Sequence, residues 1–211
     1  MSIFVNADTK VIVQGLTGGQ GKYHGLRNRD YGTNVVAGVT PGKGGQDVEG
    51  IPVFDSVAEA VAATGADASF VAVPPKAAPA AILEAAAAGV GFVVCITEGI
   101  PAQDEAKVFN TLVRDYPGTR LLGPNCPGII SPGKCNIGIT AGEIALPPSA
   151  DGPNVGIVSR SGTPNCLKMA MTATGSVALR IAPSSNATMM SKPVSAEKIM
   201  AMMPRPPKSN I

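Results

Sequence analysis

The chain of 211 residues contains no tryptophan, one histidine and few aromatic residues of any kind. Aromatic residues make up 4% of it, the net charge is only +2, and lysine and arginine form no run, so neither stacking platforms nor a basic footprint for nucleic acid are present. No apolar stretch reaches the roughly 18 residues needed to span a bilayer, and residues 6–8 turn polar before a signal-peptide core could form. The sequence therefore predicts a cytoplasmic globular protein whose partners include neither nucleic acid nor a membrane.

Metal-ligand and disulfide patterns are also missing. The four cysteines are Cys95, Cys126, Cys135 and Cys166. They form no Cys-x-x-Cys pair and have no neighbouring histidine, so we expect reduced thiols and no metal site. Cys95 lies inside an apolar run and is predicted to be a core residue, whereas Cys126 lies in the turn-rich residues 123–128, where a functional loop is expected.

Short apolar runs alternate with helical stretches up to about residue 125. This alternation predicts a Rossmann-like α/β fold, a doubly wound parallel sheet with helices on both faces. The predicted strands cover residues 11–14, 34–40, 68–73, 91–97 and 119–122. Predicted helices follow the first glycine loop, run from a cap at Asp55 to a stop at Gly65, and cover residues 77–88 and 103–115.

The most informative segment is the glycine loop at residues 15–21, directly after the first predicted strand. Its glycines at positions 15, 18 and 21 allow a tight turn and let backbone N–H groups approach a phosphate, while the following helix directs its positive dipole end to the same point. The spacing differs from the Gly-x-Gly-x-x-Gly of most dinucleotide sites. The loop therefore predicts a nucleotide or a nucleotide-like cofactor.

The end of the second predicted strand distinguishes between cofactors. An NAD site usually places an acidic residue there to bind the ribose hydroxyl. Here residues 41–45 read Pro-Gly-Lys-Gly-Gly, with Lys43 and no carboxylate. An ammonium group is suited to a phosphate, which favours a more heavily phosphorylated adenine nucleotide such as CoA. The lysine stands in a mobile glycine setting, and the other interpretation of it is a solvated loop cation.

The rest of the chain changes in character. Residues 1–127 are predicted to form the cofactor domain, and residues 128–153, rich in Gly, Pro and Ser, to be a linker. Residues 154–163 read as the first strand of a second α/β domain, which does not continue. Residues 164–211 lack aromatic residues and are interrupted by prolines, so we expect an irregular or disordered tail.

Five ordered motifs together resemble the alpha subunit of succinyl-CoA ligase. They are residues 15–21, 39–45, 96–101, 123–128 and 156–163, so the resemblance covers residues 1 to about 163. It implies a CoA-binding domain followed by a truncated, flavodoxin-like ligase domain. The family condenses succinate, CoA and a nucleoside triphosphate through succinyl phosphate and a phosphohistidine, together with a nucleotide-binding beta subunit. CoA and a beta subunit are therefore the implied cofactor and partner.

The resemblance also implies which residues bind CoA. The residues that would hold the CoA phosphates are Thr17, Gly18, Gly19 and Gln20. Lys43 would add a positive charge. The residues that would line the cofactor groove are Ile96, Thr97 and Glu98. Cys126 and its loop would face the phosphohistidine region.

The chain departs from the family pattern where the chemistry occurs. The family's phosphohistidine lies in a Gly-His-Ala-Gly segment that these 211 residues lack, and the one histidine is His24. The helix that carries a supporting glutamate is absent too, and Cys166 stands in place of a substrate-side tyrosine. No catalytic residue is therefore predicted, and we expect a chain that binds CoA without completing the ligase reaction.

Other interpretations remain open at this point. The abrupt loss of the pattern after residue 163 is what a frameshift or truncation would give, or else a shortened CoA-binding protein has a tail recruited to a partner. A non-enzymatic CoA-binding or redox-sensing module is a second function. An NAD-dependent oxidoreductase is a third, which the absent carboxylate and the absence of a catalytic Lys/Tyr or His/Asp pair disfavour.

Overall fold

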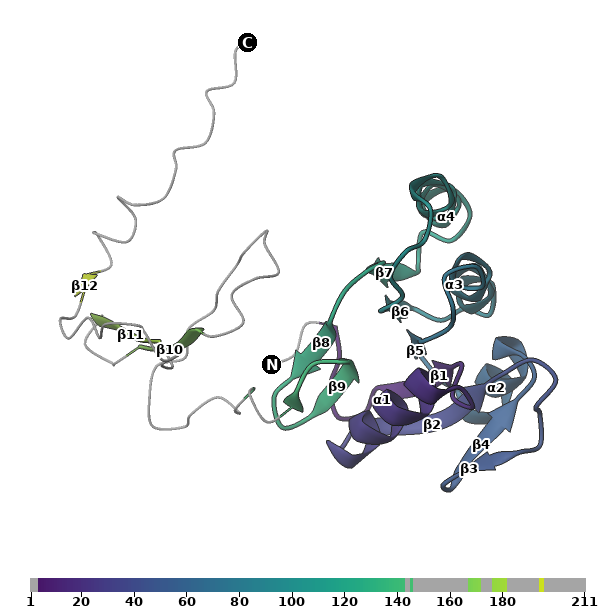
Figure 1. Ribbon diagram of the computed structural model, residues 1–211, viewed down its shortest axis with the longest axis horizontal. Coiled ribbons are helices and arrows are strands. Elements are labelled where there is room, and N and C mark those ends of the chain that lie inside the picture. Colours follow the sequence, from purple (N-terminus) through teal and green to yellow (C-terminus); the bar gives the residue numbers. More distant parts are fainter. Residues whose placement is uncertain (1–3, 143–144, 146–166, 172–175, 182–193, 196–211) are drawn as a thin grey trace, which may run out of the picture. The chain divides into compact units, whose positions relative to one another are not determined.

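The computed structural model describes residues 4–142 and 145, and beyond them the backbone of three short strands (Figure 1). The chain divides into two compact units, residues 1–147 and residues 148–211. Among the described residues, no helix combines the length and the apolar character that a membrane span requires. The first unit holds all eight of the predicted CoA-binding residues.

The first unit is built on a seven-stranded sheet in the order β3-β4-β2-β1-β5-β6-β7. Its strands are β1 (Lys10–Gln14), β2 (Asn34–Val39), β3 (Asp47–Val48), β4 (Ile51–Phe54), β5 (Ala68–Val71), β6 (Phe92–Cys95) and β7 (Arg120–Leu122). Its helices are α1 (Gly19–Asp30), α2 (Val57–Thr64), α3 (Ala78–Ala87) and α4 (Ala102–Asp115). All neighbouring strands are parallel except the edge pair β3 and β4. The predicted doubly wound, Rossmann-like parallel sheet is confirmed.

Strand order reverses at β1, which pairs with β2 on one side and with β5 on the other. In open α/β sheets, ligands bind beyond the carboxyl ends of the strands at such a switch point. Residue 15 leaves β1 at this point and residue 72 leaves β5. The topology thus places the predicted glycine loop at the position where this fold class binds its ligands.

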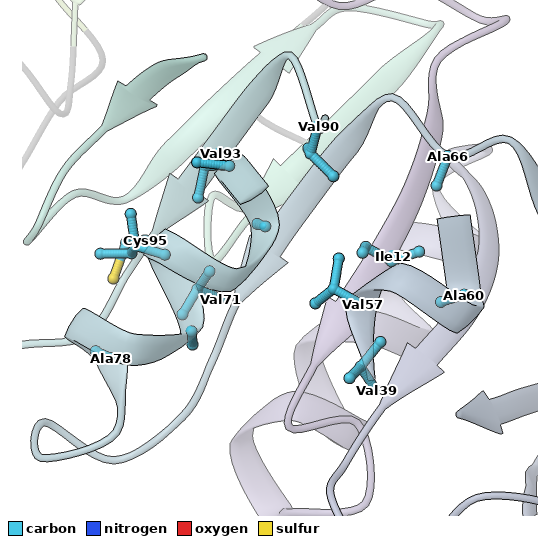
Figure 2. Close-up of a cluster of buried hydrophobic side chains, with 14 of the residues drawn as sticks. Ile12, Val39, Val57, Ala60, Ala66, Val71, Ala78, Val90, Val93 and Cys95 are labelled. Atoms are coloured by element: carbon cyan, nitrogen blue, oxygen red, sulfur yellow. The ribbon is translucent and has the colours of Figure 1, made fainter. Parts of the chain in front are cut away.

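Side chains of β1 alternate between two buried clusters, one on each face of the sheet. Ile12 faces the cluster that α2, α3 and α4 cover, and Figure 2 shows it with Val39 of β2 and Val57 of α2. Val11 and Val13 face the other cluster, which α1 covers. Helices therefore lie on both faces, and the continuous apolar strands of the sequence are explained by burial on both sides.

The start of α2 differs from the prediction. Its N-cap is Ser56, whose hydroxyl oxygen accepts a hydrogen bond from the N–H of Glu59 at 3.3 Å, and not Asp55. A serine one position later satisfies the same orphan donor, which leaves the carboxylate of Asp55 free to bind elsewhere. The predicted end of this helix is confirmed, because Gly65 is its C-cap and adopts a left-handed φ of 68°.

The predicted linker begins with ordered structure. Strands β8 (Gly128–Ser131) and β9 (Cys135–Gly138) form an antiparallel hairpin, and Cys135 and Ile137 are fully buried against the α1 face of the sheet. Glycine and proline indicated turns correctly, but the short Cys-x-Ile alternation between them becomes a buried strand because α1 and β6 lie beside it. Residues 143–144 and 146–153 lie outside the described residues.

The second unit also departs from expectation. Residues 154–163, predicted to begin a second domain, lie outside the described residues. Within the segment predicted to be an irregular tail, β10 (Leu167–Met171), β11 (Ser176–Ile181) and β12 (Val194–Ser195) form an antiparallel sheet in that order. Leucine and methionine alternate with other residues along β10, a period of two that favours a strand even without aromatic residues.

Candidate functional site

Besides the short connection at residues 55–56 after β4, five loops leave the carboxyl ends of the parallel strands at one edge of the sheet. They are residues 15–18 after β1, 40–46 after β2, 72–77 after β5, 96–101 after β6 and 123–127 after β7. In the part of the chain that the structure describes, no three His, Cys, Asp or Glu side chains gather as a possible metal site. The candidate site therefore rests on backbone donors, hydroxyl groups and Lys43.

The glycine loop is fixed by contacts that only glycine permits. Gly15 has a φ of +87°, and a Cβ there would lie 2.7 Å from the carbonyl oxygen of Ala72, which leaves β5. A Cβ on Gly21 would overlap the carbonyl oxygen of Gly15. Gly15 and Gly21 thus bring the start of α1 directly against the end of β1, as a close phosphate approach requires.

The N-terminus of α1 is left without a partner from its own segment. Its N-cap is Gly18, which has no side chain to accept from the helix, and its first turn carries no acidic residue. The first helical hydrogen bond runs from the N–H of Lys22 to the carbonyl of Gly18 at 2.8 Å. The amides of Gly19, Gln20 and Gly21 precede it, so they are first-turn donors that can meet an anion.

Next to these donors is a shallow hollow of about 370 Å³. It is lined by Thr17, Gly18, Gly19, Lys22, Tyr23, Leu26, Arg27 and Asp30. Thr17, Gly18 and Gly19 of the predicted site border it, and Gly18, Gly19 and Gln20 are exposed to solvent. An anion can therefore reach the helix terminus without any displacement of the protein.

A pair of threonines joins the glycine loop to the loop that carries Lys43. The hydroxyl of Thr17 donates to the hydroxyl oxygen of Thr40 at 3.1 Å. Thr40 follows β2 directly, at the place where NAD sites put their acidic residue. The role of Thr40 was not predicted from sequence, because only the pairing of β1 with β2 brings these two hydroxyl groups together.

Hydrogen bonds hold the backbone of the Lys43 loop, for which the sequence predicted a mobile setting. The N–H of Lys43 donates to the carbonyl of Thr40 at 3.1 Å, and the N–H of Gly45 donates to Val53 at 2.9 Å. Between them, the N–H of Gly44 donates to the carboxylate of Asp55 at 2.8 Å. Lys43 itself is exposed and takes part in none of the ion pairs that the described residues form.

The third group of predicted residues follows β6. Thr97 is buried, and its hydroxyl donates to the carbonyl of Val73 at 2.8 Å, so this hydroxyl holds the β6 loop against the β5 loop. Ile96 is half-buried and Glu98 is exposed. The structure thus places these residues at the same sheet edge as the glycine loop, and it gives the Thr97 hydroxyl a partner within the protein.

The thiols at this edge are protonated groups and not activated nucleophiles. The thiol of Cys126 donates to the carbonyl oxygen of Cys95 at 3.3 Å, which ties the β7 loop to β6. Burial raises the pKa of both thiols above its ordinary value. Because reactive cysteines need a depressed pKa, this geometry disfavours a redox-sensing function for them.

Cys135 offers a test of how firmly the β8–β9 hairpin is packed. Burial raises the pKa of its thiol to about 11, so between about pH 9 and pH 11 the unfolded chain releases this proton and the folded chain keeps it. The free energy of unfolding should therefore fall over that window by about 2 kcal/mol from this thiol. Urea unfolding at several pH values measures the slope, and the Cys135→Ala variant should show a shallower one. Equal slopes would contradict burial of the thiol.

His24 lies on α1, after the glycine loop and not within it. Its ring is half-buried and meets the ring of Tyr23 edge-on, with 4.9 Å between centroids. Partial burial, and then the positive charge of Arg27, lower the pKa of the imidazole. No described carboxylate forms an ion pair with it. The arrangement gives this histidine a structural setting and no acid–base partner.

Comparison with known proteins bears directly on this site. Residues 6–99 match the CoA binding domain family, and all eight predicted residues lie inside that range. The chain is 54% identical over 163 residues to the alpha subunit of ADP-forming succinate–CoA ligase from Aquifex aeolicus. It is 56% identical over 163 residues to alpha subunit 2 of the same enzyme from Archaeoglobus fulgidus. The resemblance to succinate–CoA ligase alpha subunits is confirmed over 77% of the chain.

The match to succinate–CoA ligase alpha subunits is partial on their side. The aligned part covers 52% of the Aquifex relative and 54% of the Archaeoglobus relative, so the chain spans about half the length of the curated relatives it matches. The matched CoA binding domain supports the expected cofactor, coenzyme A. The roles of the eight individual residues stay predictions.

Solved structures with a similar fold include larger enzymes. ATP citrate lyase from Methanosaeta concilii, in complex with (3S)-citryl-CoA, has a TM-score of 0.54 at 21% identity, covering 67% of this chain and 25% of that one. A dinucleotide-forming acetyl-coenzyme A synthetase from Candidatus Korarchaeum cryptofilum has a TM-score of 0.54 at 21% identity, covering 64% and 30%. At this identity the likeness supports the fold alone.

Proposed function

We propose that the first unit binds CoA at the carboxyl edge of its sheet, with the phosphates at the N-terminus of α1 and at Lys43. The observation that carries this proposal is the loop after β2. Where an NAD site has a carboxylate, this chain has Thr40 linked to Thr17 and an exposed Lys43 that forms no ion pair with the described acidic residues. A cation on an ordered loop, beside a helix terminus without an acidic residue, favours a ligand with several phosphates.

CoA should bind the purified chain, and NAD should not. Calorimetric titration with each ligand separately measures this. Lys43→Ala should weaken CoA binding by about 1–3 kcal/mol, the range for a charge-assisted hydrogen bond. Lys134→Ala is the matched control, because it removes the same charge from the β8–β9 turn, where Gly133 bonds to Tyr31 just beyond the C-terminal end of α1. Unchanged CoA affinity in Lys43→Ala would refute the assignment of this lysine.

The proposed assembly and chemistry follow from the relatives. The matched relatives are named alpha subunits of a ligase, so a succinate–CoA ligase beta subunit is the partner proposed for this chain. Co-expression with such a beta subunit, followed by size-exclusion chromatography, tests the pairing. Comigration of the two chains is the expected result, and separate elution would contradict it.

CoA binding without ligase chemistry is the second candidate function. His24 favours it, because the one histidine of the sequence lies on a helix and has no described carboxylate partner. The two candidates share the same CoA site and differ in thioester formation. An assay of succinyl-CoA production with a beta subunit present separates them.

A further inference from the structure

We propose that Asp55 is a positioning residue for Lys43 and thereby sets the affinity of the chain for CoA. This inference rests on the proposed CoA site and concerns a residue that does not itself contact the ligand. Asp55 follows β4, and the Lys43 loop follows β2. Because Val39 at the end of β2 is paired with Phe54 at the end of β4, the two chain segments leave the sheet side by side.

The contact between them is specific. Oδ1 of Asp55 accepts the N–H of Gly44 at 2.8 Å, directly after Lys43. A Cβ on Gly44 would lie 2.5 Å from Oδ2 of Asp55, so a side chain at position 44 would push the carboxylate off the loop. The absence of a side chain at Gly44 therefore allows the Asp55 carboxylate to approach and accept a hydrogen bond from the loop backbone.

The loop needs such a tie because of its composition. Gly42 and Gly45 have φ values of +74° and +81°, and three glycines surround Lys43 within residues 42–45. A glycine-rich loop loses much conformational entropy when it is ordered. When the loop is already fixed, less conformational entropy is lost on binding, so a pre-ordered Lys43 binds a phosphate more tightly. Asp55 supplies the one side-chain hydrogen bond that the structure gives to this loop's backbone.

The same geometry explains how an acidic residue is accommodated near a phosphate site. In an NAD site the carboxylate at the strand end accepts from the ribose. Here the nearby carboxylate belongs to Asp55, which follows the neighbouring strand β4. Its Oδ1 accepts a hydrogen bond from the N–H of Gly44, the residue after Lys43. Its function is then that of a hydrogen-bond acceptor, and its negative charge is not required.

Calorimetric titration of the full chain with CoA tests this with four variants. Asp55→Ala should bind CoA about tenfold more weakly, the equivalent of one lost hydrogen bond. Asp55→Asn retains an acceptor oxygen and should stay within about twofold of wild type. Gly44→Ala, which dislodges the carboxylate from the other side, should weaken binding as Asp55→Ala does. Glu59 lines, with Gly44 and Asp55, a second hollow that is separate from the one beside α1. Glu59→Ala is therefore a nearby acidic control and should bind CoA normally.

A double variant separates positioning from a general effect on the fold. If Asp55 acts through Lys43, then Asp55→Ala should add less than about twofold in a Lys43→Ala background. Full additivity, normal binding by Asp55→Ala, or equal weakening by Asp55→Asn would each overturn the inference. Failure of the wild-type chain to bind CoA is a different result, since it would refute the proposed function itself. Gly44→Ala and Asp55→Asn keep the test decisive if Asp55→Ala does not fold.

Discussion

Replacing Gly21 with alanine should lower the free energy of unfolding by about 3 kcal/mol and abolish measurable CoA binding. A Cβ at this position overlaps the carbonyl oxygen of Gly15, and its carbonyl carbon lies only 2.6 Å away. Both groups belong to the backbone, so no side-chain rotation relieves the overlap. The start of α1 must therefore move away from β1, and the first-turn amides then leave the position where they can meet a phosphate together.

Gly19→Ala is the matched control for this prediction. Gly19 lies two residues earlier on the same helix, and a Cβ there would meet nothing within 4 Å. Alanine is a better helix former than glycine by up to about 1 kcal/mol, so this variant should be as stable as wild type or more stable. Urea unfolding of the two variants side by side measures the contrast. Equal stability would show that Gly21 does not pack against Gly15 in solution.

Local patterns in the sequence were sufficient to predict the parallel part of the sheet. Alternating apolar runs and helical stretches identified β1, β2, β5, β6 and β7, because burial on both faces leaves continuous apolar strands. The glycine loop was also predictable from a local pattern. The close contact of Gly15 with Gly21 spans only six positions and requires glycine. Features of this kind are encoded within one segment of chain.

Contacts that depend on strand pairing were not predicted. Strand β4 was missed because it is four residues long and contains Pro52, and with it the hydrogen bond that the N–H of Gly44 donates to Asp55 was missed. The β8–β9 hairpin was assigned to a linker, although Asn136 exchanges two hydrogen bonds with Thr33 at 2.7 and 2.8 Å. Gly44 and Asp55 are 11 positions apart, and Thr33 and Asn136 are 103 positions apart. The pattern of a single segment therefore does not predict either contact.

Long-range hydrogen bonds fix the loops that are proposed to bind the CoA phosphates. Four of the predicted CoA-binding residues belong to the glycine loop and one to the Lys43 loop. The hydrogen bond between the hydroxyl groups of Thr17 and Thr40 links the two loops. Pre-ordered donors lose less entropy on binding than mobile ones. The sequence identified the groups that would meet a phosphate, and the structure adds the hydrogen bonds that hold those groups in place before a ligand arrives.

Incubated with a beta subunit and γ-labelled ATP or GTP, this chain should acquire no histidine-bound phosphate and form no succinyl-CoA. The family resemblance implies a phosphoryl group that is carried on a histidine, and such a carrier must reach both a donor and an acceptor. His24 is the one histidine of the sequence. It is held on α1 with its ring half-buried against Tyr23, so it cannot travel between two sites.

The electrostatic setting of His24 leads to the same expectation. Partial burial lowers the pKa of the imidazole, and no described carboxylate forms an ion pair with it, so neither tautomer nor orientation is fixed by an acidic partner. The assay looks for acid-labile, base-stable label on this subunit, with His24→Asn as the matched control and CoA binding as the measure of correct folding. Label that disappears in His24→Asn would show that this helix-bound histidine accepts phosphate after all, and would refute the expectation of CoA binding without ligase chemistry.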